Sequence, residues 1–491
     1  MPKRITKNTK TDFIVNMSKS GFMMLTFIFL AIACVGTGLS LLPYYLKKGT
    51  DFVSGGLSEA TSVAVRMSDA ISMLETATII LMAVGFFGFL ILLISGSKKY
   101  FKPKENIPML LLVGYLLMCV ISTFMAYDVN VAIFGSEGRY EGLVSLIAYT
   151  GFFAASSQLT DQKLKVKLVA VICVVAVLQA VVGILQSFEA TFEILPTFFG
   201  EKYEVQGTMS EHYIANGFAG SPYALASLLT MATALCFAGF MYCKNKKGAV
   251  AFGIFGIVTA TGCILTKNLG AIVGLLAVVL CLVILEIVRI KSGHGLFVKG
   301  FLNNPLGKLI LGTLVAGAIF VILLATDNFT FEDSYIVLQD SFSRLFLSRP
   351  AFYTSGVKVY SHIWKDMFTQ IKDNFVFGMG ADCIGMKMYG IPKTLEIAGS
   401  ADRAYNEYLN MAASTGVVSL VFYLGFVAGC LKRGVKGVSQ FFNLKDNWTK
   451  TACFAGCVGY LACGVFSVSS VVSTPVFFTL LGLCFSKTEK D

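Results

Sequence analysis

Residues 269–290 read LGAIVGLLAVVLCLVILEIVRI and contain one acidic and one basic side chain, both close to the end. About 20 apolar residues are the length that an α-helix needs to cross a hydrocarbon core of about 30 Å. Similar runs recur along the 491-residue chain, of which 55% is hydrophobic and only 14% charged, whereas soluble globular chains average about 25% charged residues. This composition excludes a disordered, collagen-like or disulfide-framed secreted protein. It predicts an all-α integral membrane protein.

The apolar runs predict about twelve transmembrane helices. They lie at 22–46, 75–97, 108–127, 142–159, 164–186, 215–242, 248–265, 269–290, 306–326, 409–431, 450–470 and 471–486. Only serine, threonine and proline separate the last two runs, so ten to twelve spans fit the sequence. The first run is too long for a cleaved signal peptide and is interpreted as a retained signal anchor.

The predicted spans divide the chain into five regions. They are a basic cytoplasmic tail (1–21), a membrane domain of about nine spans (22–326), a large extracytoplasmic loop (327–408), the C-terminal spans (409–486) and a short cytoplasmic tail (487–491).

The charged residues predict the orientation of these spans. If the N-terminus is inside, the inner segments hold 26 Lys and Arg against 7 Asp and Glu, and the outer segments hold 14 against 22. Basic residues accumulate on the cytoplasmic side of membrane proteins. We therefore expect both termini in the cytoplasm, and we expect the net charge of +11 to face lipid headgroups and not nucleic acid.

The cysteines and paired glycines are interpreted as packing residues. Twelve of the 13 cysteines fall in or beside apolar runs, and only Cys383 lies in a long polar loop. Small polarizable core residues explain this distribution better than a redox or metal site does. Gly270 with Gly274, and Gly425 with Gly429, have the spacing of small residues at helix–helix contacts.

Two long polar segments, 187–214 and 327–408, are expected on the outer face, and we place the chemistry there. Loops of this length are usually functional or disordered, and 327–408 is rich in aromatic residues. Within it, residues 360–371 have the spacing of an amphipathic helix with Trp364 and Phe368 on one side, suited to lying on a membrane surface. The chain has no nucleotide-binding glycine motif, so we expect no nucleotide or other cofactor.

Outward-facing arginines are the candidate substrate-binding residues. Arg139 lies in a short loop before the fourth span, and Arg344, Arg349 and Arg403 lie in the large loop. The rigid donor fork of arginine suits phosphate oxygens, so these residues could clamp a pyrophosphate lipid. The alternative is that each arginine pairs with a neighbouring acid or with lipid headgroups.

A second cluster, residues 401–409, runs directly into the tenth predicted span. We expect Asp402 to cap that helix and Glu407 to lie near its positive N-terminal end, where carboxylates are stabilised. The same position also suits an anion bound by free backbone N–H groups.

Four short motifs in this order resemble the bacterial O-antigen ligase and O-antigen polymerase family. They are Gly138-Arg139-Tyr140-Glu141-Gly142-Leu143; Val205-Gln206-Gly207-Thr208 followed by Asn216-Gly217; Phe377-Gly378-Met379-Gly380 downstream of Arg349 and Trp364; and Arg403-Ala404-Tyr405-Asn406-Glu407-Tyr408-Leu409 with Gly416. The second motif is interrupted and lacks the family's proline. In the fourth, Tyr405 stands where the family has histidine.

The resemblance implies an enzyme of the bacterial cytoplasmic (inner) membrane that needs no metal. Such enzymes transfer a glycan from a polyprenyl-pyrophosphate-linked donor to a glycan or lipid acceptor at the outer face, during assembly of cell-surface polysaccharide. The arginines would bind the pyrophosphate, and Asn406 is also assigned to substrate binding. A phenol with a pKa of about 10 is a poor base at neutral pH. Tyr405 is a candidate catalytic residue by its position in the motif, and Glu407 and His212 are candidates because one of them could serve as the base in its place.

Three other interpretations remain open. Tyr405 is the substitution that a catalytically weak or non-catalytic relative could carry, and such a protein would bind lipid-linked glycan without turnover. A lipid-linked oligosaccharide flippase would place charged residues inside its spans, which are nearly free of charge here. The same distribution disfavours a solute transporter. Ligase and polymerase share one architecture and are not separated by these residues.

Overall fold

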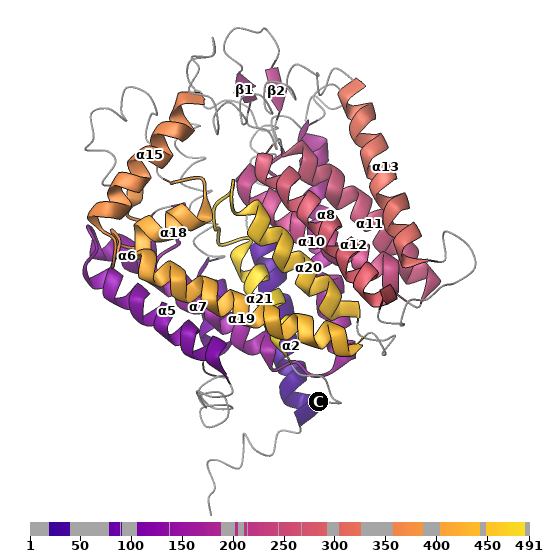
Figure 1. The fold of residues 1–491 in the computed structure, drawn as a ribbon, viewed down its shortest axis with the longest axis horizontal. Helices are drawn as coiled ribbons and strands as arrows, with labels where there is room; N and C mark the ends of the chain where they lie inside the picture. Colours follow the sequence, from indigo (N-terminus) through magenta and orange to yellow (C-terminus); the bar gives the residue numbers. More distant parts are fainter. Residues whose placement is uncertain are drawn as a thin grey trace, which may run out of the picture.

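The structure is a computed structural model in which most of the described residues belong to α-helices (Figure 1). It describes residues 19–39, 78–88, 90, 106–136, 138–187, 202–204, 211–213, 215–243, 245–266, 268–291, 304–325, 357–385, 403–441 and 448–486. The fold is described for these ranges.

In the described ranges, the helices follow one another along the chain with one strand pair between them. The first are α2 (Lys19–Gly38), α5 (Ile107–Phe124), α6 (Val129–Phe134), α7 (Leu143–Ser157) and α8 (Gln162–Ser187). Strands β1 (Lys202–Glu204) and β2 (Glu211–Tyr213) then pair antiparallel, with Tyr203 opposite His212. After them come α10 (Pro222–Tyr242), α11 (Lys246–Leu265), α12 (Leu269–Arg289) and α13 (Pro305–Ala325). The last are α15 (Val357–Asp373), α18 (Glu407–Thr415), α19 (Val417–Phe441), α20 (Trp448–Cys463) and α21 (Thr474–Phe485).

Seven of the described helices are long and apolar enough to cross a membrane. They are α2, α5, α8, α10, α11, α12 and α19, and four shorter apolar helices include α7, α13 and α21. This supports the prediction of a helical protein with several membrane-crossing helices. The count of twelve spans and the inside–outside orientation stay predictions.

Three predicted span boundaries are wrong. The sixth helix begins at Pro222 and not at 215, because Gly217 and Gly220 adopt positive φ values of 56° and 68° in the turn before it. The tenth span is broken at Gly416, which has a φ of 91° and separates α18 from α19. The eleventh helix ends at Cys463, seven residues before its predicted end at 470. Hydropathy alone did not show these turns, since the residues within them are themselves small or apolar.

Helix α10 is the centre of the bundle and is buried along almost its whole length. It packs against α8, α11, α12, α13 and α20. The paired glycines lie at helix contacts as predicted. A Cβ on Gly270 or Gly274 would lie 2.8 Å from an atom of α20 or α10, and one on Gly429 would lie 2.6 Å from Pro108 of α5.

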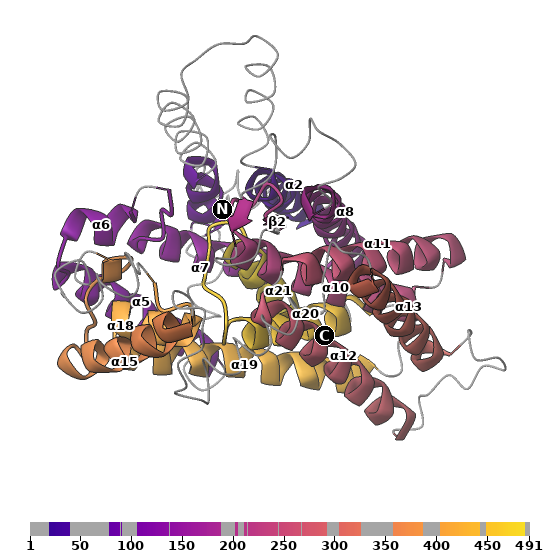
Figure 2. The ribbon, with the colours of Figure 1, turned by 90° about the horizontal axis from the view of Figure 1, so that it is seen from above.

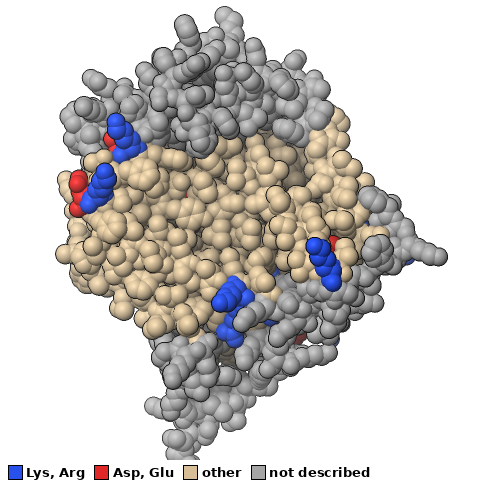
Figure 3. All heavy atoms as spheres, in the orientation of Figure 1, with Lys and Arg blue, Asp and Glu red and all other residues tan. Residues whose placement is uncertain are grey.

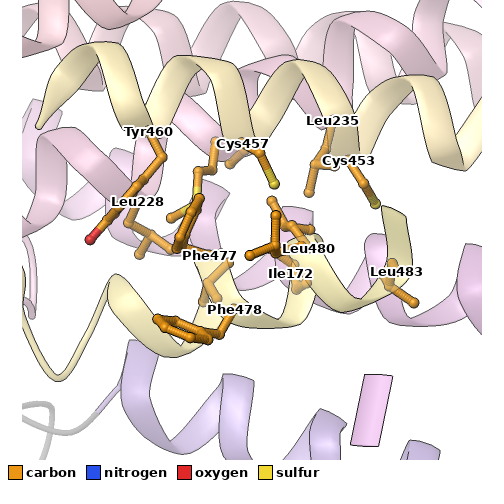
Figure 4. Packing of buried hydrophobic residues seen from close by; sticks show 14 of the residues in the cluster. Ile172, Leu228, Leu235, Cys453, Cys457, Tyr460, Phe477, Phe478, Leu480 and Leu483 are labelled. Carbon is orange, nitrogen blue, oxygen red and sulfur yellow. The ribbon is translucent and has the colours of Figure 1, made fainter. Parts of the chain in front are cut away.

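Eleven of the cysteines belong to this core, which confirms their interpretation as packing residues. All 13 are free thiols, and all but Cys243 are buried. Figure 4 shows Cys453 and Cys457 of α20 among Leu228, Phe477 and other apolar side chains of α10 and α21.

The polar elements gather at one end of the bundle. Figure 1 places β1, β2 and α15 toward the top. In Figure 2, α15 and α18 lie together on the side away from α12 and α13. The visible lysines and arginines of the described part stand at the edges of a broad uncharged face (Figure 3). An uncharged face of this kind is suited to contact with the hydrocarbon core of a bilayer.

Helix α15 confirms the amphipathic helix predicted at 360–371, but its two aromatic residues differ in environment. Met367 and Ile371 are buried against α18, and Trp364 packs on the same cluster. Phe368 is 53% exposed, so it does not share the buried side with Trp364. The buried stripe follows residues 364, 367 and 371, and Phe368 lies just outside that stripe.

Candidate functional site

The loop that joins α6 to α7 carries Arg139 on a tightly folded backbone. Gly135 and Gly138 have φ values of 88° and 77°, and a Cβ on Gly135 would collide with the backbone at Tyr140 and Glu141. The loop folds back on itself in this way, and Arg139 Nη2 donates to Ser136 Oγ at 2.8 Å. The local fold therefore sets the direction of the guanidinium group.

Asp382 is the partner of this loop. Arg139 Nε lies 3.0 Å from Asp382 Oδ1. The Ser136 N–H donates to Asp382 Oδ2 at 2.7 Å, and the Ser136 hydroxyl donates to the Asp382 carbonyl oxygen. One carboxylate thus ties together the guanidinium and the loop backbone across 243 residues of sequence.

The turn at 377–380 places Asp382. Gly378 and Gly380 have φ values of 71° and 103°, and the N–H groups of Met379 and Gly380 donate to the carbonyls of Ala413 and Ser414 at 2.9 and 2.8 Å. A Cβ on Gly378 would collide with the Ser414 carbonyl. The turn therefore rests directly on the C-terminal end of α18.

Arg403 joins the same cluster from the segment before α18. Its Nη1 lies 3.5 Å from Glu141 Oε2 and donates to the Ser469 carbonyl oxygen at 3.0 Å. The Ser469 hydroxyl donates to the same Glu141 oxygen at 3.2 Å. Glu141 follows Arg139 by two residues, so the two ion pairs are neighbours.

The N-terminus of α18 is capped by Asn406. Its Oδ1 accepts the N–H groups of Tyr408 and Leu409, both at 3.0 Å. The prediction that Asp402 caps this helix is therefore wrong, and Asp402 itself lies outside the described residues. The helix begins four residues later than that interpretation required, which gives Asn406 a structural role besides its predicted substrate contact.

Tyr405 lies directly before the cap in the left-handed region, with a φ of 48°. Its ring packs on that of Tyr223 at the start of α10, with 5.1 Å between centroids. The Trp364 indole N–H donates to the carbonyl of the preceding Ala404 at 2.9 Å. The segment that carries the family-like motif is thus held by α10 on one side and α15 on the other.

Glu407 is the deepest ionisable group of the cluster and is only 5% exposed. Its N–H donates to the Gly464 carbonyl at 2.8 Å, and its Oε1 accepts from the Tyr460 hydroxyl at 3.2 Å. Burial raises the pKa of Glu407 from 4.5 to about 8, against the lowering effect of the Tyr460 hydrogen bond and with a smaller raising effect from Glu141. A carboxyl group of this kind gains and loses a proton near neutral pH.

Burial also raises the pKa of Glu141. The positive charge of Arg403 opposes this rise, and Asp382 adds to it. Arg403, and to a smaller extent Arg139, therefore stabilise the Glu141 carboxylate against the effect of burial.

Backbone strain gathers in these same segments. The described residues include three non-glycine residues with positive φ, namely Tyr140, Asp382 and Tyr405. Each lies within or beside the ionic cluster formed by Arg139, Asp382, Arg403 and Glu141. Such conformations cost about 1–3 kcal/mol each and are concentrated at functional sites.

The structure brings five of the eight predicted site residues together. They are Arg139, Arg403, Tyr405, Asn406 and Glu407. His212 lies in β2, where only its backbone pairing with Tyr203 is described. Arg344 and Arg349 lie outside the described residues, as does the motif at 205–208.

Sequence reasoning did not assign roles to Glu141, Asp382 or Tyr460. Glu141 lies inside the motif quoted for Arg139, and Asp382 follows the Gly-x-Gly turn, so both were within reach of that reasoning. Tyr460 lies in the middle of an apolar run and carries no local signal. Its role depends on the contact between α20 and the start of α18.

The arrangement places two guanidinium groups and a titratable carboxyl in one polar cluster. Both arginines pair with acids in this structure, as the simpler interpretation of them predicted. An arriving phosphate could replace Asp382 at Arg139 or Glu141 at Arg403, since phosphate and carboxylate oxygens accept hydrogen bonds from the same guanidinium donors. Within the described ranges, no group of three or more histidine, cysteine, aspartate or glutamate side chains is placed to hold a metal ion.

No protein-family model and no curated protein matches the chain.

Proposed function

We propose that this chain is a membrane glycosyltransferase of O-antigen ligase or polymerase type, acting at the outer face of the bacterial cytoplasmic membrane. It would move a glycan from a polyprenyl-pyrophosphate carrier to an acceptor hydroxyl. The observation that carries the proposal is that Arg139, Arg403 and the titratable Glu407 all interact with one buried carboxylate, Glu141. The twelve-span topology with both termini inside belongs to the same proposal.

The reaction requires that negative charge be stabilised on the departing pyrophosphate. The acceptor oxygen forms a bond to the anomeric carbon while the bond from that carbon to the pyrophosphate oxygen breaks, and the electron pair leaves with the pyrophosphate. Preorganised arginine donors stabilise such charge without moving a proton. Ser136 and the Ser469 carbonyl hold Arg139 and Arg403 in place while the pyrophosphate replaces their carboxylate partners.

The acceptor hydroxyl must lose its proton as it attacks. Glu407 supports this role because its pKa of about 8 matches proton transfer near neutral pH. Tyr405, which stands where the family has histidine, is assigned to orientation of the acceptor beside Tyr223. Attack from the face opposite the pyrophosphate would invert the anomeric centre.

A second candidate is a non-catalytic relative that binds lipid-linked glycan. Two observations favour it, namely that both arginines are engaged by carboxylates and that residue 405 is tyrosine. This candidate predicts lipid binding without release of polyprenyl pyrophosphate.

The test is a comparison of arginine variants in proteoliposomes supplied with extracted polyprenyl-pyrophosphate-linked glycans. We expect Arg139→Ala and Arg403→Ala each to lower turnover by about 100- to 1000-fold. Lys372→Ala, which removes an exposed charge from α15, is the matched control and should leave turnover unchanged. Full turnover in both arginine variants would contradict the proposal, and binding without any turnover would favour the second candidate.

A further inference from the structure

A short chain of hydroxyl groups ends on Glu407. The Tyr460 hydroxyl lies 3.2 Å from Glu407 Oε1 and 3.2 Å from Thr474 Oγ1. The Ser470 backbone N–H donates to the same Thr474 oxygen at 3.1 Å. Tyr460 and Thr474 are both buried, so their hydroxyls are shielded from bulk water.

The ionised carboxylate of Glu407, which can only accept, fixes the direction of this chain. A backbone N–H can only donate, and the tyrosine hydroxyl has a single proton. When Glu407 is ionised, Tyr460 donates that proton to Oε1 and accepts the proton of Thr474. The Ser470 N–H, the Thr474 hydroxyl and the Tyr460 hydroxyl then each donate to the next group in the chain, which ends at the carboxylate.

Packing holds this chain in place. The Tyr460 ring stacks on Phe477 of α21, with 4.3 Å between centroids and 17° between planes. Thr474 begins α21, and the turn before that helix is closed by the hydrogen bond of the Ser473 N–H to Ser470 Oγ. The hydroxyl groups therefore have little freedom to turn away from Glu407.

Gly464 keeps space beside the other carboxylate oxygen. A Cβ at this position would lie 2.8 Å from Glu407 Oε2. Gly464 is not among the glycines with positive φ, so the backbone conformation does not require glycine there. Glycine is instead favoured because a side chain here would lie too close to Oε2.

Several other groups face Glu407 and contribute to its environment. The acid Glu141 comes from the loop before α7 and is paired with Arg403. In the described part of the chain, four further hydroxyls and a thiol from α5, α7, α18, α19 and α20 interact with Glu407 electrostatically, namely Tyr115, Tyr149, Tyr408, Tyr423 and Cys463. Unlike these five, Tyr460 donates a hydrogen bond to the Glu407 carboxylate.

We propose that Tyr460 and Thr474 are positioning residues that hold Glu407 Oε1 and set its proton affinity, leaving Oε2 to take the proton of the acceptor hydroxyl. This inference rests on the proposed role of Glu407 as the base. In the transfer step, that proton moves to Oε2 as the glycosidic bond forms and the bond to pyrophosphate breaks. The proton is released from Glu407 to water before the next turnover.

The first test measures the protonation of Glu407 directly and does not need turnover. Infrared difference titration of the reconstituted protein follows the carboxyl band, which is assigned by its loss in Glu407→Gln. Tyr460→Phe keeps the ring stack but removes the donor to the anion, so the midpoint should rise by about one to two pH units. Thr474→Val should raise it by a smaller amount.

The control is Tyr408→Phe. The Tyr408 hydroxyl also lies close to Glu407 but donates to the Leu461 carbonyl, so its removal should leave the midpoint unchanged. An unchanged midpoint in Tyr460→Phe would overturn the proposal. So would an equal rise in Tyr408→Phe, since the effect would then be one of general packing.

The second test is the pH dependence of turnover. If Glu407 is the base, the alkaline shift of the infrared midpoint in Tyr460→Phe should appear as an equal shift of the pH–rate profile. An infrared shift without any turnover in the unmodified protein would retain the positioning role and reject the proposed function. A shifted infrared midpoint with an unshifted rate profile would show that Glu407 is positioned but is not the base.

Discussion

The raised proton affinity of Glu407 predicts a pH-dependent gain in stability when the residue becomes glutamine. The folded protein holds this proton up to a pKa of about 8, whereas the unfolded chain releases it near 4.5. Between these values the folded state binds one more proton than the unfolded state does. The free energy of unfolding therefore falls by about 1.4 kcal/mol for each pH unit.

Glu407→Gln removes this dependence and retains an oxygen that accepts from Tyr460. The stability of the variant relative to the unmodified protein should rise by about 2.3 kcal/mol from pH 6 to pH 8, where the folded protein is half ionised, and level off at higher pH. Contributions of other groups cancel in this difference as long as their own pKa values are unaltered. The sign follows from a raised carboxyl pKa, whose stabilising contribution is present at low pH and is lost toward pH 8.

The assay is reversible unfolding in mixed detergent micelles, followed by tryptophan fluorescence at several pH values. Glu286→Gln is a useful reference because it changes another buried carboxyl group, which lies near the C-terminal end of α12. Parallel stability curves for Glu407→Gln and the unmodified protein between pH 6 and 8 would refute the reasoning, since Glu407 would then titrate below that range.

Three further predictions concern the helix cap and turn beside the site and the orientation of the chain in the membrane. Asn406→Ala should destabilise the protein by about 1 kcal/mol through loss of the α18 cap, measured by the same unfolding assay, and a loss below a few tenths of a kcal/mol would reject the capping role. Gly416→Ala should cost at least about 2 kcal/mol, because φ is 91° and the new Cβ would collide with the Val376 carbonyl; normal yield and stability would contradict this geometry. In intact cells, Lys372→Cys on α15 should react with a membrane-impermeant maleimide and Lys246→Cys at the start of α11 should not, whereas the reverse pattern would invert the proposed topology.

The sequence predicted the parts of the fold that depend on long apolar runs. Residues 269–290 became α12 almost to the residue, and the amphipathic spacing at 360–371 became α15. The glycine pairs lie at helix contacts as their spacing predicted. These features are local, so a period or a run length is enough to find them.

The breaks between helices could not be found in this way. Gly416 interrupts a run that hydropathy joins into one span, and its conformation depends on the turn at 376–378 that packs against it. The cap of α18 was assigned to Asp402 because several residues before the helix can serve as caps. The hydrogen bonds from the Tyr408 and Leu409 N–H groups to the Asn406 side chain identify Asn406 as the cap.

The candidate site was predicted as a set of residue types but not as a set of partners. The sequence singled out Arg139 and Arg403, yet Asp382 lies 243 residues from the first and Glu141 lies 262 residues from the second. Nothing in the local pattern relates such distant positions. The hydroxyl chain from Tyr460 was missed for the same reason, since it depends on where α20 and α21 meet α18.

The most direct test of the central claim is a balanced turnover measurement on purified protein in proteoliposomes. Polyprenyl-pyrophosphate-linked glycan and acceptor are supplied, and the released carrier and the glycosylated acceptor are both quantified. The account predicts one polyprenyl pyrophosphate released for each glycan transferred, an inverted anomeric centre, and loss of both products in Arg403→Ala and Glu407→Gln. Bound donor with neither product, or transfer that is unaffected in both variants, would contradict it.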